Sequence, residues 1–247
     1  MENTKRKFDV SSAGLHILAM LFMLSDHAWA TIAQSQEWMT CVGRIAFPIF
    51  ACLIAEGYHH TGNFQKYILR MLVFALISEI PFNLMYGGSV IYPYHQNVLW
   101  TFIIALLGIR LVDWVKEKGR LWLTVLVAAA VIAVGTLLGF LCKTDYYGFG
   151  VLMVVLFHFF RGRRWWCFLG QLAGMYFLNM ELMGGYCYIV DIFGRETEIM
   201  QQSFALLALI PIWLYRGRQG PHSKAFKYFC YAFYPAHILL LVLISSL

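Results

Sequence analysis

Long apolar stretches separated by short polar turns recur along almost the whole chain. The chain is 60% hydrophobic and 13% charged, and its mean hydropathy is +0.65. A soluble domain typically carries about 25% charged residues, so this composition indicates an integral membrane protein. At about 20 residues per crossing, the chain is long enough for roughly eight to ten spans. We therefore expect residues 1–247 to form a single all-α membrane bundle.

The apolar stretches and their turns predict nine membrane-spanning helices. The first follows a basic segment, as in a signal peptide, but no small-residue cleavage site precedes Asp26, so we expect an uncleaved span. Pro48 predicts a kink in the second span, and Pro235 predicts an interruption of the last. The segment 182–198 is the longest predicted loop. The predicted spans are 13–33, 41–60, 67–86, 98–113, 121–141, 149–160, 165–181, 199–215 and 226–247.

Lysine and arginine gather at one set of span ends. If the N-terminus is cytoplasmic, all but three of the 19 basic residues lie on the cytoplasmic side, among them Lys5, Arg6 and Lys7. Cytoplasmic loops of membrane proteins carry such an excess. The sequence therefore predicts a cytoplasmic N-terminus and an outer C-terminus. The net charge of +6 reports this orientation and does not indicate a nucleic-acid partner.

Polar side chains from five segments converge on the outer half of the predicted bundle. Asp26 and His27 lie side by side in the first span, where each charge costs about 2.5–3.5 kcal/mol at the helix centre. Such groups normally face the bundle interior or a water-filled cavity. A purely structural alternative pairs Arg44 with Glu79 or Asp26. The other members are Asn83, Tyr94, His95, Gln96, Asn97, Asp145 and Tyr146.

Histidine is the side chain best suited to move a proton near neutral pH, so we expect a site built around His27. Adjacent helical residues do not face each other. Asp26 is therefore better suited to pair with Arg44, or with His27 through a water molecule, than to contact His27 directly, which leaves the imidazole to face the interior. The alternative is an interfacial pair that reaches the membrane surface. No serine nucleophile motif, phosphate loop or HExxH motif is present in the sequence.

A second polar cluster lies at the opposite side of the membrane, around Glu56, His59 and His60. Adjacent helical histidines point about 100° apart, so we expect no metal here. Lys66 and Arg70 are four residues apart on one helical face. Together with Arg110 they could hold phosphate groups, or they could be ordinary cytoplasmic anchors.

Two further candidate site residues lie in the last span, and one candidate in the third span has an alternative, structural role. Tyr234 and His237 flank Pro235 and are expected either to touch a substrate or to be buried and hydrogen-bonded. Asn83, two residues after Pro81, could instead satisfy the backbone that this proline opens.

Five stretches carry a resemblance to a known family. The chain resembles the TraX family, the F-pilin acetylases of conjugative plasmids and their bacterial relatives. The matching stretches cover nearly the whole chain in order. They are LSDHAW (24–29), VGRIAFPIFACLIAEGYHHTGNFQKYILRMLVFALISEIPFNL (42–84), HQNVLWT (95–101), DYYGFGVL (145–152) and KYFCYAFYPAHILLL (227–241).

The resemblance implies a multi-pass acetyltransferase in the bacterial cytoplasmic membrane. It would move an acetyl group from cytoplasmic acetyl-CoA to an amine or hydroxyl acceptor on the outer side, either a protein, such as the pilin N-terminus, or a glycan. Membrane lipid is then a partner, and a homo-oligomer is compatible with this reading. The resemblance implies a central role for His27. From the polar clusters we expect Asp26, Arg44, Glu79 and Asn83 to act with it in catalysis. We also expect Lys66, Arg70, Arg110, His59 and Tyr67 to bind acetyl-CoA, and Tyr94, His95, Asn97, Asp145, Tyr146, Tyr234 and His237 to bind the acceptor.

The residues leave the mechanism and the class of protein open. His27 could be a general base, or it could carry the acetyl group covalently. A proton-coupled transporter is the main alternative function, because intramembrane Asp, His, Glu and Arg also suit a proton relay. The lack of a clear inverted repeat counts against it. A non-catalytic assembly factor is a third reading.

Overall fold

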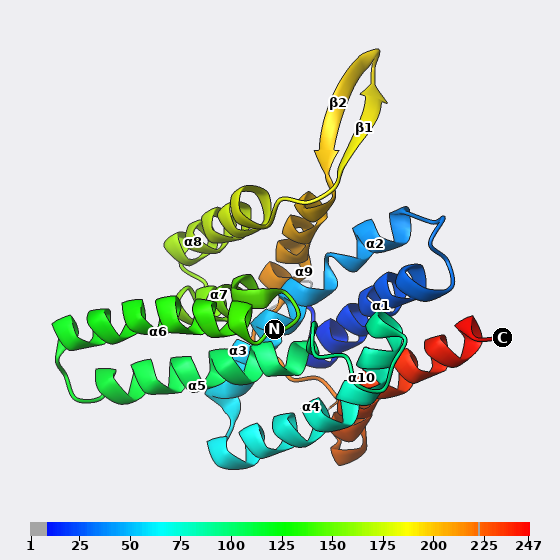
Figure 1. Ribbon diagram of the computed structural model, residues 1–247. Coiled ribbons are helices and arrows are strands. Elements are labelled where there is room, and N and C mark those ends of the chain that lie inside the picture. Colours follow the sequence, from blue (N-terminus) through cyan, green and yellow to red (C-terminus); the bar gives the residue numbers. More distant parts are fainter. Residues whose placement is uncertain (1–8, 222) are drawn as a thin grey trace, which may run out of the picture.

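The computed structural model describes residues 9–221 and 223–247 as a helical bundle from which one β-hairpin projects (Figure 1). Lys5, Arg6 and Lys7 lie outside the described residues. The α-helices are α1 Ser12–Thr31, α2 Trp38–Gly43, α3 Ala46–His60, α4 Phe64–Gly87, α5 Val98–Lys116, α6 Leu121–Leu141, α7 Tyr147–Phe159, α8 Trp165–Tyr176, α9 Leu209–Leu214 and α10 Lys224–Ser245. A π-helix, Phe177–Met183, continues α8, and a 3₁₀ helix, Gln201–Ala208, precedes α9.

Helices occupy every one of the predicted spans, so the mostly helical membrane fold is confirmed. Among the described residues, five helical segments are long and apolar enough to cross a membrane: Trp38–His60, Phe64–Gly87, Val98–Lys116, Leu121–Leu141 and Lys224–Ser245. The nine crossings and the cytoplasmic N-terminus stay predictions.

Side-chain caps begin several of these helices. Ser11 Oγ accepts a hydrogen bond from the Gly14 amide at the start of α1, and Asn63 Oδ1 accepts one from Lys66 at the start of α4. Asn97 does the same for α5 through the Leu99 amide. Each such cap satisfies a backbone donor that the helix itself leaves unpaired. Gly88, with φ of 61°, ends α4 in the left-handed conformation that suits glycine.

The prolines act differently from the prediction. The second span does break, but between Gly43 and Ala46, and Pro48 lies in the first turn of α3, where a missing N–H costs little. The predicted interruption at Pro235 is wrong, because α10 runs through it without ending. Asn83 does not repair the backbone around Pro81, because its Nδ2 donates to the Val90 carbonyl 3.0 Å away.

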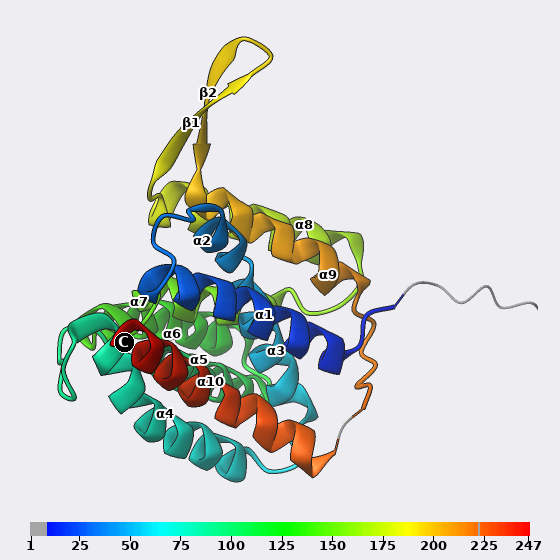
Figure 2. The same ribbon diagram turned by 90° about the vertical axis from the view of Figure 1, so that its right-hand side faces the viewer.

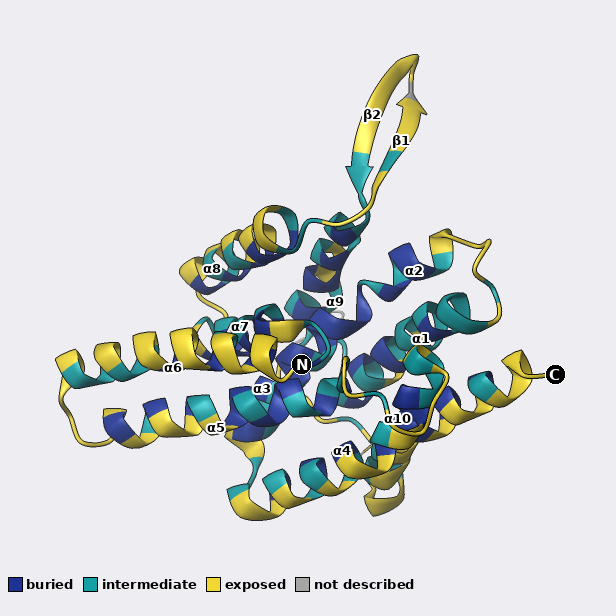
Figure 3. Cartoon of the chain, viewed as in Figure 1, coloured by how far each residue is buried: buried dark blue, intermediate teal, exposed yellow. Residues whose placement is uncertain are grey.

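The core lies around α3, and α6 covers it from one side. In the segment formed by α2 and α3, 67% of the apolar stretch is buried, whereas only 11% of the apolar stretch of α6 is buried. Figure 3 shows the same contrast between a dark α3 and a largely yellow α6. Figure 2 shows α1, α10 and α4 lying side by side across another face. Apolar side chains exposed on such faces are what a helical bundle presents to lipid.

The segment predicted as the longest loop is mainly a β-hairpin. Strands β1, Cys187–Ile192, and β2, Arg195–Met200, pair antiparallel with Cys187 opposite Met200. The two-residue turn has positive φ at both Phe193 (56°) and Gly194 (80°), as a type I′ turn requires. The hairpin extends away from the bundle (Figure 1). The sequence predicted this segment as a connection between spans but did not predict its two strands.

Candidate functional site

Two cavities lie next to each other inside the bundle. The larger has a volume of about 410 Å³ and the smaller about 70 Å³. Five residues line both cavities, so the two cavities lie directly beside each other. The shared residues are Met23, Phe50, Val98, Phe102 and Tyr234.

One face of α1 runs along both cavities. His16 lines the larger cavity, Met23 lines both, and His27 lines the smaller. His16 and His27 are eleven residues apart, which is about three helical turns or about 16 Å. Their side chains therefore project from the same side of the helix, with Met23 between them. Helix α1 therefore contributes to the wall of both cavities.

The small cavity holds a charged pair. Arg44 Nη2 lies 2.6 Å from Asp26 Oδ1 and 2.7 Å from Asp26 Oδ2, and Thr40 Oγ1 donates to the same carboxylate at 2.8 Å. Gly43 makes room for this pairing, since a β-carbon there would collide with Asp26. The prediction that Asp26 pairs with Arg44 is confirmed. The guanidinium is thereby fixed in the wall of the small cavity.

His27 is buried and meets a second imidazole from α10. Its Nδ1 lies 2.7 Å from His237 Nε2, and the two rings are stacked with planes 5° apart. His237 Nδ1 lies 2.6 Å from the Phe233 carbonyl. A carbonyl only accepts, so His237 Nδ1 carries a proton. In a neutral ring its Nε2 is then an acceptor, and His27 Nδ1 is the donor.

This tautomer leaves His27 Nε2 as the nitrogen with a free lone pair. No described residue forms a hydrogen bond with that atom. Because His27 lines the small cavity, this tautomer provides an unprotonated ring nitrogen on a residue of its wall.

The opposite wall of the small cavity comes from the start of α7. Tyr146 stacks on Phe47 with ring centroids 3.8 Å apart, and its backbone has φ of 60°. Asp145 holds this turn, because its carbonyl accepts from Thr101 Oγ1 at 2.6 Å and its carboxylate accepts from the Tyr146 amide at 3.1 Å. A non-glycine residue in the left-handed region is strained, and such strain gathers at functional sites.

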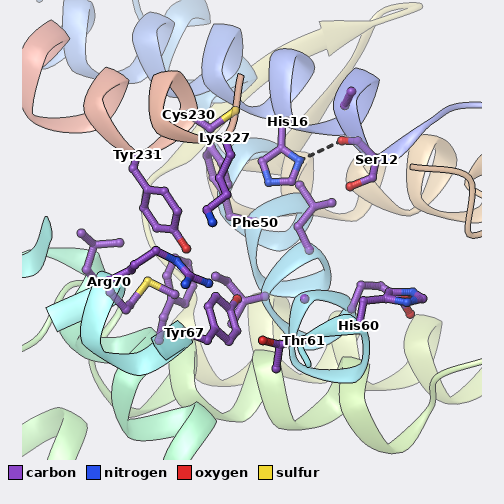
Figure 4. Close-up of a pocket in the computed structure, with 18 of the residues that line it drawn as sticks. Ser12, His16, Phe50, His60, Thr61, Tyr67, Arg70, Lys227, Cys230 and Tyr231 are labelled. Carbon is purple, nitrogen blue, oxygen red and sulfur yellow. Dashed lines mark hydrogen bonds and ion pairs between the residues drawn. The ribbon is translucent and has the colours of Figure 1, made fainter. Parts of the chain in front are cut away.

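The larger cavity carries positive charge (Figure 4). The Arg70 guanidinium lies 5.8 Å from the centre of the Tyr67 ring and beside the Tyr231 hydroxyl. Lys227 projects into the same space. Within the described chain, neither Arg70 nor Lys227 forms an ion pair with a carboxylate. Two cations without acidic partners make this cavity suited to an anion.

Among the described residues, one carboxylate lines the larger cavity, Glu56, and it is already paired. Arg161 Nε donates to Glu56 Oε1 at 2.6 Å, and His60 Nε2 lies 3.3 Å from Glu56 Oε2. The hydrogen bond to Glu56 raises the pKa of Arg161 above its ordinary value, so this pair stays charged. Glu56 therefore does not neutralise Arg70 or Lys227.

Several predicted site residues lie outside both cavities. Asn97 donates to the Ala75 carbonyl at 2.9 Å and to Glu79 Oε2, and the Trp100 indole donates to the same oxygen at 2.9 Å. These bonds join α4 to α5. Glu79 is therefore not the partner of Arg44.

Of the residues expected to bind the acceptor, some line a cavity and others do not. Tyr94 is 62% exposed, with the Lys143 ammonium 4.7 Å from its ring centre. His95 Nε2 lies 3.3 Å from Asp145 Oδ1. Tyr94, His95 and Asn97 line neither cavity, whereas Asp145, Tyr146 and Tyr234 do.

The predicted phosphate cluster is only partly assembled. Arg70 and Tyr67 line the larger cavity, but Lys66, Arg110 and His59 do not. Lys66 is exposed, and Arg110 lies 5.9 Å from the ring centre of Phe64. His59 Nε2 instead meets His158 Nδ1 at 3.2 Å, and His158 Nε2 lies 3.3 Å from Asp113. In the part of the chain that the structure describes, no three His, Cys, Asp or Glu residues are arranged to hold a metal ion.

The sequence held signals for the residues that were missed. Lys227 and Tyr231 were missed, although they lie four residues apart and three residues before the predicted Tyr234, which places all three on one face of α10. His16 shares the face of His27 by the same periodicity. Tyr86, in the wall of the small cavity, had no such signal, because only the tertiary packing brings it there.

The fold and the site define a polytopic helical membrane protein with a polar cavity inside the bundle. The family model described as TraX protein matches residues 11–245. The chain belongs to the TraX protein family.

Curated relatives agree with this membership. A probable fimbrial assembly protein FimC, serogroup H1, of Dichelobacter nodosus is 26% identical over 252 residues, covering 96% of each chain. Protein TraX of Escherichia coli strain K12 is 30% identical over 143 residues, covering 57% of this chain and 52% of its own length. No solved structure matches the chain.

Proposed function

We propose that the protein is a membrane acetyltransferase that uses acetyl-CoA. The larger cavity would bind the donor from the cytoplasmic side, and the small cavity would bring its acetyl group to an acceptor from the outer side. The observation that carries this proposal is the adjacency of the two cavities, which share five lining residues. One is cationic and the other holds an imidazole with a free nitrogen, and they share a wall.

The donor end is supported by charge and distance. Arg70 and Lys227 suit the phosphates of coenzyme A, because cationic side chains form strong, charge-assisted hydrogen bonds to phosphate oxygens. From the level of His16 to that of His27 is about 16 Å along α1, a distance that an extended pantetheine arm spans. The thioester would then lie beside His27 while the nucleotide stays among the cations.

The chemistry needs a base and donors for the developing oxyanion. The acceptor's nitrogen or oxygen attacks the thioester carbon, and His27 Nε2 takes the proton that the acceptor loses. Arg44, fixed by Asp26, and the hydroxyl of Tyr146 supply positive charge and a donor for the oxyanion. The tetrahedral intermediate then collapses, the C–S bond breaks, and the proton on His27 passes to the leaving thiolate. In a covalent variant, His27 Nε2 attacks the thioester carbon and the C–S bond breaks to release the thiolate. The acceptor then attacks the acetyl carbon, the C–N bond to His27 breaks, and the acceptor's proton passes to the thiolate.

The acceptor is a protein amine of the pilus-subunit type in this proposal. The support is the name of the fimbrial assembly relative, which covers the chain from end to end, together with the resemblance to pilin acetylases. A cell-surface glycan hydroxyl is the alternative acceptor for the same chemistry.

The test uses purified protein in lipid nanodiscs with radiolabelled acetyl-CoA. A peptide with a free N-terminus and a neutral oligosaccharide serve as separate acceptors. His27→Ala and His27→Gln should lose about 10²–10⁴-fold in transfer rate, the usual worth of a general base, while acetyl-CoA still binds. Near-normal transfer by His27→Gln contradicts the assigned role, and a wild-type protein that does not bind acetyl-CoA contradicts the whole proposal.

A proton-coupled transporter is the second candidate. The observation that favours it is the 2.7 Å contact between His27 and His237 inside the membrane, which would also pass a proton. Reconstituted liposomes with a pH-sensitive dye separate the two functions. A transporter moves protons without acetyl-CoA, whereas the acetyltransferase does not.

A further inference from the structure

The small cavity has a volume that limits what can react beside His27. An engineered cavity of about 150 Å³ takes up benzene, so each of its six heavy atoms uses about 25 Å³. On that scale the 70 Å³ of the small cavity accommodates about three heavy atoms. An acetyl group has three, two carbons and one oxygen, and a butyryl group has five.

The walls of this space are held by packed aromatic rings. Phe102 stacks on Phe47 with centroids 5.7 Å apart and planes 13° apart, and Phe47 stacks on Tyr146 at 3.8 Å. Phe102 is 3% exposed and Phe47 is 4% exposed. Gly150 allows this close stack, since a β-carbon there would come within 2.9 Å of both Phe47 and Tyr146. These packed rings therefore resist the displacement that a longer acyl chain would require.

Phe50 lies at the junction of the two cavities. It lies on α3 one turn after Phe47, is partly buried, and lines both spaces together with Phe102. Removing its ring would join the small cavity to the larger one. The larger cavity has apolar side chains on this side, including Leu53 and Ile54.

We infer that Phe50 and Phe102 set the length of the acyl group, restricting transfer to the two-carbon acetyl chain. The inference rests on the proposed function, because it concerns the donor of that reaction. It assigns chain-length selection to two aromatic side chains at the junction of the cavities, apart from the groups that perform the chemistry.

The test compares acetyl-CoA with butyryl-CoA in the nanodisc assay. One methylene in a close-fitting pocket is worth about 10–200-fold in discrimination, so the wild type should prefer acetyl by at least about tenfold. Phe50→Ala should reduce this preference at least about tenfold by improving butyryl transfer. Phe102→Leu, a smaller change at the buried position, should shift the preference in the same direction. Phe177→Ala is the matched control, because this phenylalanine is 54% exposed and lines neither cavity.

The outcomes are separable. A wild type that transfers butyryl as well as acetyl overturns the inference and leaves the proposed acyl transfer standing. An unchanged preference in Phe50→Ala and Phe102→Leu, with both variants folded by size-exclusion chromatography, also overturns it. A wild type that transfers neither chain overturns the proposed function, and the inference falls with it.

Discussion

His27 and His237, 210 positions apart in the sequence, lie with Nδ1 and Nε2 2.7 Å apart inside the bundle. The backbone carbonyl of Phe233 fixes the proton on His237, and His237 in turn fixes the proton on His27. In enzymes, one ring nitrogen of a reactive histidine often donates its proton to an acceptor, and this hydrogen bond fixes the tautomer and the orientation of the ring. Here the acceptor is an imidazole, which keeps the centre free of an additional negative charge.

The first prediction concerns His237 as a positioning residue. His237→Leu removes the acceptor for the His27 Nδ1 proton, so the active tautomer is no longer favoured. We expect kcat for acetyl transfer to fall about 2- to 12-fold, the effect of losing one hydrogen bond worth about 0.5–1.5 kcal/mol, with KM for acetyl-CoA unchanged. His237→Gln should restore much of the rate, because its amide oxygen can accept the same proton.

The pH profile of kcat/KM separates positioning from structure. A shifted profile in His237→Leu, restored in His237→Gln, supports the assigned role. Equal losses in both variants, accompanied by a lower Tm, would mean that His237 contributes packing alone.

The second prediction concerns the donor cavity. Arg70→Gln and Lys227→Gln should each raise the Kd for acetyl-CoA about 10- to 100-fold, because a hydrogen bond to a charged group is worth about 1.5–3 kcal/mol. Lys66→Gln is the control, since Lys66 is exposed and lines neither cavity. Calorimetry measures the affinities.

A truncated donor sharpens this test. Acetyl-pantetheine lacks the phosphates, so its transfer should be insensitive to Arg70→Gln and Lys227→Gln. If the two variants weaken both donors equally, these cations do not bind phosphate.

The sequence predicted those parts of the molecule that depend on local pattern. Hydropathy located every helical segment, and the non-facing geometry of neighbours on a helix correctly separated Asp26 from His27. It could not decide whether Arg44 meets Asp26 or Glu79, because that choice depends on how α2 folds back on α1. Lys66 and Arg70 show the same limit. Their four-residue spacing is real, but the tertiary packing turns only Arg70 into the cavity.

The third prediction separates a structural asparagine from a substrate contact. Asn97 caps α5 and bonds to Ala75 and Glu79 at the junction of α4 and α5. Asn97→Ala removes the cap and leaves the buried end of Glu79 with one fewer donor, so we expect a loss of about 1–3 kcal/mol in the free energy of unfolding. KM values for both substrates should stay unchanged in the folded fraction.

Asn63 provides the matched comparison. It caps α4 in the same way but is exposed. Asn63→Ala should therefore lower the free energy of unfolding only by the worth of the cap, about 0.5–2 kcal/mol. Thermal unfolding in detergent compares the two variants. A specific rise in KM for the acceptor in Asn97→Ala, with unchanged Tm, would return Asn97 to the substrate site.

The last prediction concerns orientation, on which the placing of donor and acceptor depends. All but Arg44, Lys143 and Arg195 of the 19 basic residues fall on one side of the predicted bundle. Since basic loops remain in the cytoplasm, the cationic cavity around Arg70 and Lys227 should face the cytoplasm and the C-terminus of α10 should lie outside. Alkaline phosphatase fused after Leu247 should therefore be active, whereas a fusion within 117–120, between α5 and α6, should be inactive. A green fluorescent protein fused at the same two points should give the reverse pattern. An inactive phosphatase with a fluorescent partner at Leu247 would overturn the nine-span count, and a reversed pattern within 117–120 as well would reverse the sides assigned to donor and acceptor.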